Sequence, residues 1–112
     1  MKILHNSRCR KSREALQLLT DNKADFEVVE YLKEPISKDT LTGIIDALGV
    51  EPLSIIRKGE KVFKENYKGK EFSKEEWIDI MVENPILIER PIVFTSDKAV
   101  VGRPPENVLE MI

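Results

Sequence analysis

The spacing of apolar positions changes several times along the chain, and each change predicts an element. The short stretch KILH, residues 2–5, predicts a first strand. Residues 11–22 have helical spacing, carried by Ala15, Leu16, Leu18 and Leu19. The segment FEVVEY, residues 26–31, is rich in β-favouring residues and predicts a second strand. Strand, helix and strand within about thirty residues indicate a βαβ unit with a parallel pair of strands.

The middle of the chain is dominated by helical spacing. After Pro35, Ser37 is an expected N-cap and Gly49 stands where a helix commonly ends. The apolar face of this helix consists of Leu41, Ile44, Ile45 and Leu48. Residues 52–68 are interrupted by Gly59 and predict two short helical pieces.

A second capping signal follows at Ser73-x-x-Glu76, which predicts a capping box at the start of another helix. Asn84-Pro85 is expected to end that helix. Its predicted buried side carries Trp77, Ile80 and Met81.

The C-terminal part returns to β-like patterns. PIVFT (91–95) and KAVVG (98–102) flank the polar pair Ser96-Asp97, which predicts a β-hairpin. Pro104 and Pro105 then open a final helix, whose expected inward residues are Val108, Leu109 and Ile112. The order is β-α-β, a helical insertion at about 35–88, and β-β-α. We expect one α/β domain over residues 1–112, with a mixed sheet and a topology that resembles thioredoxin.

Composition narrows the functional classes. The 112 residues are 41% hydrophobic, enough for a single core, and 34% charged with a net charge of −2. This balance argues against general nucleic-acid binding, which requires a basic face. The lone cysteine excludes an internal disulfide and does not indicate an extracellular protein. The apolar part of MKILHNSRC is too short for a signal peptide or membrane span, so we expect a cytoplasmic protein without membrane contact.

The stretch HNSRCRKSRE, residues 5–14, contains the only cysteine and the only histidine of the chain. Cys9 is predicted at the start of the first helix, where exposed N–H groups favour a thiolate over a thiol. Four neighbouring cations add positive potential: Arg8, Arg10, Lys11 and Arg13. A reactive cysteine requires surroundings of this kind, which stabilise its thiolate. A lone cysteine is nevertheless often only a small buried side chain.

Two neighbours of Cys9 have alternative roles. A protonated His5 near the sulfur would lower the pKa of the thiol, or His5 would simply bond to a carbonyl. Ser12 completes a C-x-x-S pattern and would hydrogen-bond either the thiolate or the helix backbone. Without a second cysteine, any redox cycle must use an outside thiol. One Cys and one His lack companions at ligand spacing, so no metal site is expected.

Four motifs together are typical of one family. H-N-x-x-C-x-x-S-R, I-R-K, NPILIERPIV (84–93) and G-R-P run from His5 to the final helix. In this combination the chain resembles the thioredoxin-fold arsenate reductases that couple to glutaredoxin, the ArsC family. The resemblance implies that Cys9 is the catalytic nucleophile, assisted by His5, Asn6 and Ser12. It also implies that oxyanions bind to three arginines: Arg57, Arg90 and Arg103.

The same resemblance implies a mechanism and its partners. Pro91 falls on the proline that follows a cis peptide bond beside the active site of thioredoxin-like folds. The thiolate of Cys9 would attack arsenate, with glutathione as co-substrate, glutaredoxin as reductant and no bound cofactor. Two alternatives remain: a glutathione-dependent thiol oxidoreductase acting on another substrate, and a regulator that binds RNA polymerase. Arg10 and Lys11, where the best-known members have smaller residues, leave the physiological substrate open.

Overall fold

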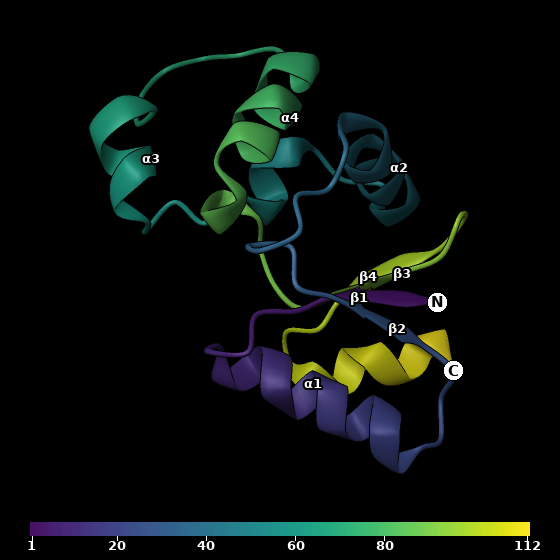
Figure 1. The fold of residues 1–112 in the computed structure, drawn as a ribbon. Coiled ribbons are helices and arrows are strands. Elements are labelled where there is room, and N and C mark those ends of the chain that lie inside the picture. Colours follow the sequence, from purple (N-terminus) through teal and green to yellow (C-terminus); the bar gives the residue numbers. More distant parts are fainter.

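A four-stranded mixed sheet organises the chain, and the computed structural model describes residues 1–112 (Figure 1). The strands are β1 (Lys2–Leu4), β2 (Glu27–Val29), β3 (Ile92–Phe94) and β4 (Ala99–Val101), in the spatial order β2-β1-β3-β4. β1 pairs with β2 in parallel, whereas the β1–β3 and β3–β4 pairs are antiparallel. The predicted α/β class, parallel pair and C-terminal hairpin are confirmed.

Helices cover both faces of the sheet (Figure 1). On one face lie α1 (Arg10–Asp21) and the C-terminal 3₁₀ helix η3 (Pro105–Met111), which pack against each other. On the other lies the helical segment, with α2 (Lys38–Leu48), α3 (Lys61–Asn66), α4 (Lys74–Glu83) and two short 3₁₀ helices, η1 (Pro52–Ile55) and η2 (Pro85–Leu87). The chain therefore has the thioredoxin-like layers that the sequence predicted, with the additional helices on one side.

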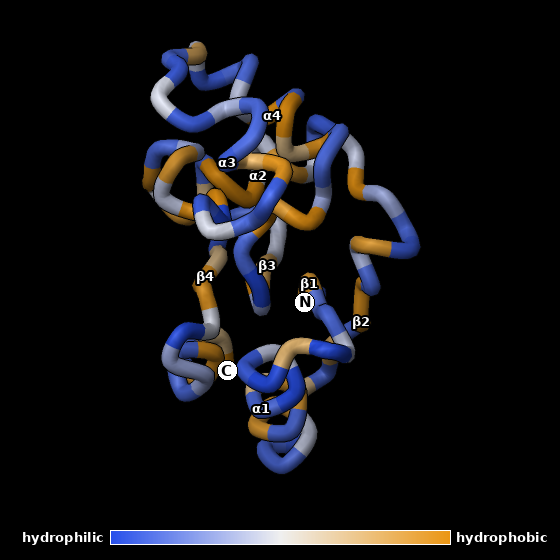
Figure 2. Tube along the Cα trace, turned by 90° about the vertical axis from the view of Figure 1, so that its left-hand side faces the viewer, coloured by the Kyte–Doolittle hydropathy of each residue, from blue (hydrophilic) through white to orange (hydrophobic).

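The alternation of side chains along the strands divides the core in two. Ile3 and Val93 point to the small cluster beneath α1 and η3, while Leu4 and Ile92 join the larger cluster beneath the helical segment. Figure 2 shows apolar positions concentrated in the strands and helices, with hydrophilic positions in the outer loops. No helix is both long and apolar enough to cross a membrane.

The predicted helix boundaries in the middle of the chain are confirmed by their caps. The Ser37 hydroxyl accepts a hydrogen bond from the Thr40 N–H, and Gly49 ends α2 with a φ of 68°. At the start of α4, Ser73 and Glu76 form the reciprocal capping box. Residues 52–68 contain two short helical pieces, as predicted, but Arg57 lies in the loop between them.

The C-terminal helix differs from its prediction. Val108 is buried, but Leu109 is 39% exposed and Ile112 is 59% exposed, so the expected inward orientation of these two residues is wrong. The reason is the 3₁₀ geometry: with three residues per turn, every third residue lies on the same face. The residues facing the core are therefore Pro105, Val108 and, partly buried, Met111.

Segment ends also differ slightly from the expectation. β1 ends at Leu4 rather than His5, although the His5 N–H still donates to the Val29 carbonyl at 2.9 Å. The first helix begins at Arg10, one residue before the predicted start, with Cys9 as its N-cap residue. β2 comprises only three residues and is an edge strand that pairs with β1 alone.

Gly102 lies at a close approach between the hairpin and the C-terminal helix. A Cβ atom there would lie 2.7 Å from Pro91 Cγ and 3.0 Å from Val108 Cγ1. We expect Gly102→Ala to lower the free energy of unfolding by about 1–3 kcal/mol, because buried neighbours must move. Urea denaturation followed by circular dichroism measures this change.

Gly43 supplies the matched control. It lies inside α2, and a Cβ atom added there would meet no other atom within 4 Å. Gly43→Ala should therefore raise the free energy of unfolding by about 0.5–1 kcal/mol, because alanine loses less backbone freedom in a helix than glycine. Equal effects of the two substitutions would contradict the close approach at Gly102.

Candidate active site

The loop between β1 and α1 presents Cys9 at the start of the helix. The Cys9 N–H donates to the Asn6 carbonyl at 3.0 Å, and Asn6 Oδ1 accepts from the Arg8 N–H at 3.0 Å. Arg13 Nη1 donates to the Ser7 carbonyl at 3.0 Å, which attaches the loop to the first turn of α1. Cys9 is half-buried, so its thiol remains accessible from one side.

His5 and Ser12 form a buried pair behind this loop. His5 Nδ1 lies 2.6 Å from Ser12 Oγ, which also accepts a hydrogen bond from the Asn6 N–H at 3.1 Å. Burial lowers the pKa of His5 below its ordinary value, although the carboxylate of Glu30 opposes this effect. When Nδ1 carries no proton, it can accept a hydrogen bond from the Ser12 hydroxyl.

This pair corrects two expectations. The partner of His5 Nδ1 is the Ser12 hydroxyl and not a backbone carbonyl, and burial disfavours the protonated form of the ring. The Ser12 hydroxyl bonds neither the thiolate nor the helix backbone, since it joins His5 to the Asn6 N–H. Both residues, together with Asn6, shape the loop that carries Cys9.

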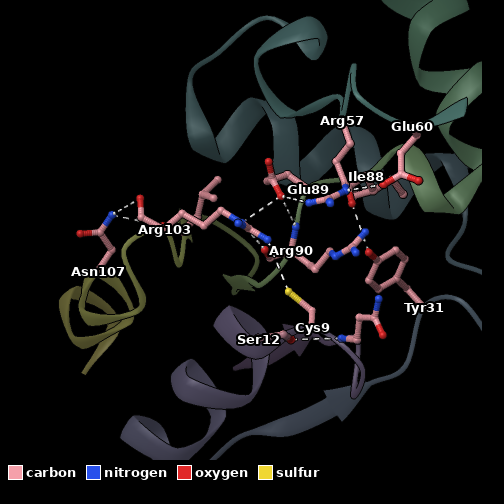
Figure 3. Close-up of polar contacts among 12 residues, drawn as sticks. Cys9, Ser12, Tyr31, Arg57, Glu60, Ile88, Glu89, Arg90, Arg103 and Asn107 are labelled. Carbon is pink, nitrogen blue, oxygen red and sulfur yellow. Dashed lines mark hydrogen bonds and ion pairs between the residues drawn. The ribbon is translucent and has the colours of Figure 1, made fainter. Parts of the chain in front are cut away.

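Arg103 reaches the sulfur from the other end of the chain, while the side chain of Arg90 extends toward Tyr31 (Figure 3). Arg103 Nη2 donates to Cys9 Sγ at 3.4 Å, while Arg103 Nε donates to the Arg90 carbonyl at 2.8 Å. Arg90 is only 8% exposed, and its Nε and Nη1 atoms are buried without a hydrogen-bond partner. The peptide bonds that follow both arginines are cis, which for Arg90–Pro91 is the expected form and for Arg103–Pro104 was not anticipated from the sequence.

The pKa of the Cys9 thiol lies below its ordinary value. Burial raises this pKa, but the Ser12 backbone N–H, a hydrogen bond from Arg90 and the charges of Arg103 and Arg90 together outweigh burial. The cations adjacent in sequence are not among these causes. Arg10, for example, pairs with Glu14 at 2.9 Å on an exposed helix face. The Ser12 N–H at the helix start, a location the sequence predicted, therefore favours the thiolate, together with two distant arginines rather than the neighbouring cations.

Arg57 lies beside this pair without a hydrogen bond to Cys9. Its Nη1 donates to Glu89 Oε1 at 2.8 Å and its Nε donates to Glu60 Oε2 at 3.1 Å. Burial lowers the pKa of Arg57, but hydrogen bonds to both carboxylates raise it overall, so the guanidinium stays charged. The structure thus brings Arg90 and Arg103 to the sulfur, and connects Arg57 to them through Glu89.

Two residues of the site were absent from the sequence-based prediction. Glu89 Oε1 lies 3.0 Å from Arg103 Nε and accepts a hydrogen bond from the Arg90 N–H at 3.1 Å. Tyr31 is fully buried, and its hydroxyl donates to the Ile88 carbonyl at 3.1 Å beside Arg90 (Figure 3). Burial raises the pKa of Tyr31, although Arg90 opposes this effect. Glu89 stands within the singled-out NPILIERPIV segment, but nothing local marked Tyr31.

The arrangement suits one kind of chemistry. A thiolate is a nucleophile, and unpaired guanidinium N–H groups bind oxyanions with two parallel hydrogen bonds. An oxyanion that accepted hydrogen bonds from Arg90 would lie beside the nucleophilic sulfur. No group of three or more His, Cys, Asp or Glu side chains has an arrangement that would hold a metal ion.

Fold and site together define a thioredoxin-like protein with a single cysteine at the start of the first helix and arginines converging on it. The chain belongs to the ArsC family, because the sequence model of that family matches residues 4–111.

Individual relatives agree with this assignment. The chain is 46% identical to the uncharacterized protein YfgD of Escherichia coli, over all of this chain and 96% of that protein. It is 40% identical to a protein named arsenate reductase in Haemophilus influenzae, over 98% of this chain and 97% of the relative. Among solved structures, the arsenate reductase from Vibrio cholerae superposes with a TM-score of 0.91 at 38% identity, covering 100% of this chain and 98% of that one.

The reactivity of Cys9 tests the electrostatics of the site. Because its pKa is lowered, the thiolate persists to lower pH than in a free cysteine. The rate of iodoacetamide alkylation should therefore rise through an inflection below about 8.5. Arg103→Ala removes a donor and a charge, and should move this inflection to higher pH.

Arg10→Ala is the matched control. The Arg10 side chain is 83% exposed and paired with Glu14, so its loss should leave the inflection in place. A wild-type inflection at or above about 8.5, or equal shifts in the two variants, would contradict the assignment of the lowered pKa to the distant arginines.

Proposed function

We propose that the protein is an arsenate reductase in which Cys9 is the single nucleophile and glutathione and glutaredoxin supply the electrons. The observation that carries this proposal is the buried Arg90 guanidinium, whose Nε and Nη1 have no partner, next to the Cys9 sulfur. Relatives named arsenate reductase along nearly the whole chain support the same activity.

Arsenate matches the charge and shape of the site. It is a tetrahedral oxyanion that carries more than one negative charge at neutral pH. Arg103 adds positive charge at the sulfur, and the buried Arg90 guanidinium, whose Nε and Nη1 have no partner, adds a second positive charge beside it. Bound in this way, the arsenic atom would lie within reach of the nucleophile.

The chemistry proceeds through sulfur–arsenic bonds. The Cys9 thiolate attacks arsenic, a S–As bond forms, and an As–O bond breaks with release of hydroxide or water. Glutathione replaces a second oxygen on arsenic. A glutaredoxin thiolate then attacks the glutathione sulfur and forms a disulfide, while the electron pair of the broken As–S bond stays on arsenic and reduces As(V) to As(III). Water finally displaces the Cys9 sulfur and arsenite leaves.

The surrounding residues have distinct parts in this scheme. Arg90 and Arg103 stabilise the negative charge that develops on the arsenate oxygens as the bonds change. Arg57 adds positive potential from behind Glu89. His5, Asn6 and Ser12 keep the loop in the shape that exposes the sulfur.

A hollow beside the Cys9 loop offers a place for the thiol co-substrate. It has a volume of about 340 Å³ and includes Arg8, Lys33 and Glu30 in its lining. Glutathione carries two carboxylates and one ammonium group, and the hollow offers it Arg8 and the ion pair of Lys33 with Glu30, in which Nζ lies 3.6 Å from Oε1. Its thiol would then approach the adduct from the loop side.

Replacement of the nucleophile is the first test. Cys9→Ser should abolish turnover, because the chain has no other thiol. The measurement is arsenate-dependent NADPH oxidation with glutathione, glutaredoxin and glutathione reductase present. Arg10→Ala keeps the thiol and serves as the control. Arsenate reduction at the wild-type rate by Cys9→Ser would refute the proposal. Disulfide reduction without arsenate turnover in the wild type would instead favour a thiol oxidoreductase.

Replacement of Arg90 tests the oxyanion contact. Arg90→Ala removes the unpaired donors and should lower kcat/KM for arsenate about 10²–10³-fold. Arg90→Lys keeps the charge without the planar fork and should restore only part of this loss. Circular dichroism confirms that each variant is folded, and full activity of Arg90→Lys would contradict recognition by the fork.

A further inference from the structure

One carboxylate, that of Glu89, connects all three arginines of the site. We propose that Glu89 is a positioning residue that orients Arg57 and Arg103 and limits the positive potential at Cys9. The proposal rests on the proposed function, since it assigns Glu89 to the same oxyanion site. Its action runs through the arginines, because Glu89 itself does not contact the sulfur.

The contacts converge on a single oxygen. Glu89 Oε1 accepts hydrogen bonds from Arg57 Nη1 at 2.8 Å and from the Arg90 backbone N–H at 3.1 Å. Glu89 Oε1 also forms an ion pair with Arg103, whose Nε lies 3.0 Å from this oxygen (Figure 3). Arg103 Nε donates its hydrogen bond to the Arg90 carbonyl at 2.8 Å, and the Glu89 carboxylate adds an ion pair at the same nitrogen. Since Arg103 Nη2 points to Cys9 Sγ, holding Nε on the same edge of the guanidinium group sets the direction of that donor.

The backbone around Glu89 is itself held in place. The Glu89 N–H donates to the Ile55 carbonyl at 2.8 Å, and the Arg57 N–H donates to the Leu87 carbonyl at 2.8 Å. Between them, Ile56 and Ile88 form an antiparallel bridge. These bonds join the loop of Arg57 to the segment before β3, so both side chains start from fixed positions.

Glu60 provides a comparison, because among the three arginines of the site it pairs with Arg57 alone. It meets Arg57 Nε at 3.1 Å and has no contact with Arg90 or Arg103. Of the two carboxylates, only Glu89 reaches Arg103, and through Arg103 the sulfur. A carboxylate retained in a site for anions costs binding of the substrate, because it competes with the oxyanion for the same arginines. The benefit of the Glu89 carboxylate is the alignment of the arginine N–H donors. Donors that are held in one orientation can stabilise the transition state without first reorganising.

The test separates binding from turnover. Glu89→Gln removes the negative charge and retains the size of the side chain. We expect kcat for arsenate to fall about tenfold or more, because the arginines lose their orientation. Sulfate should protect Cys9 from iodoacetamide roughly three- to tenfold better, because the positive potential is no longer offset. For the same reason the inflection of Cys9 alkylation should move to lower pH.

Two further variants separate this role from simple loss of structure. Glu60→Gln removes a carboxylate from Arg57 alone, so the Cys9 inflection should remain at its wild-type position. Glu89→Asp keeps the charge but shortens the reach, so sulfate protection should stay at the wild-type level while kcat falls. General loss of structure in Glu89→Gln would weaken sulfate protection.

The outcomes distinguish this proposal from the proposed function. Sulfate protection and alkylation need no arsenate turnover, so they test Glu89 even if the wild-type protein does not reduce arsenate. A Glu89→Gln variant with wild-type kcat, weaker sulfate protection or an unmoved inflection would overturn the positioning role. Tighter sulfate protection together with reduced kcat would establish it.

Discussion

A buried guanidinium beside a sulfur is the interaction on which the candidate site depends. Arg90 is 8% exposed, and two of its nitrogen atoms have no partner. Burying charged donors without hydrogen bonds is costly. The charge of Arg90 lies beside the thiol and helps to hold the sulfur as a thiolate.

The pKa of the Cys9 thiol is lowered by a local contact, the Ser12 N–H at the start of α1, and by two arginines from the other end of the chain. Arg10 and Arg13, close to the cysteine in sequence, bond to Glu14 and to the Ser7 carbonyl. Arg90 and Arg103, from the other end of the chain, hydrogen-bond or charge-stabilise the thiolate. The carboxylates that pair with Arg57 and Arg103 keep the clustered guanidinium groups from repelling one another strongly. Folding therefore brings two arginines from the C-terminal part of the chain to a cysteine in a basic loop, and both lower the pKa of its thiol.

The sequence by itself determined the elements and the residue types of the site. Hydrophobic periodicity and capping signals depend on residues that are close in sequence. Ser37, Gly49 and the Ser73–Glu76 capping box therefore mark the helix ends correctly. The family-like motifs point to Cys9 and to the arginines of the C-terminal half. The last helix shows the limit of such patterns: α-helical spacing predicts inward positions for Leu109 and Ile112, but the chain forms a 3₁₀ helix there and exposes both.

Only the tertiary structure decided which groups meet. That Ser12 binds His5, that Arg57 binds Glu89, and that Tyr31 lies beside Arg90 depends on packing between segments that are separated in the chain. Hydrogen bonds and pKa values depend on distances of a few ångströms and on burial, and no periodicity in a sequence encodes either quantity.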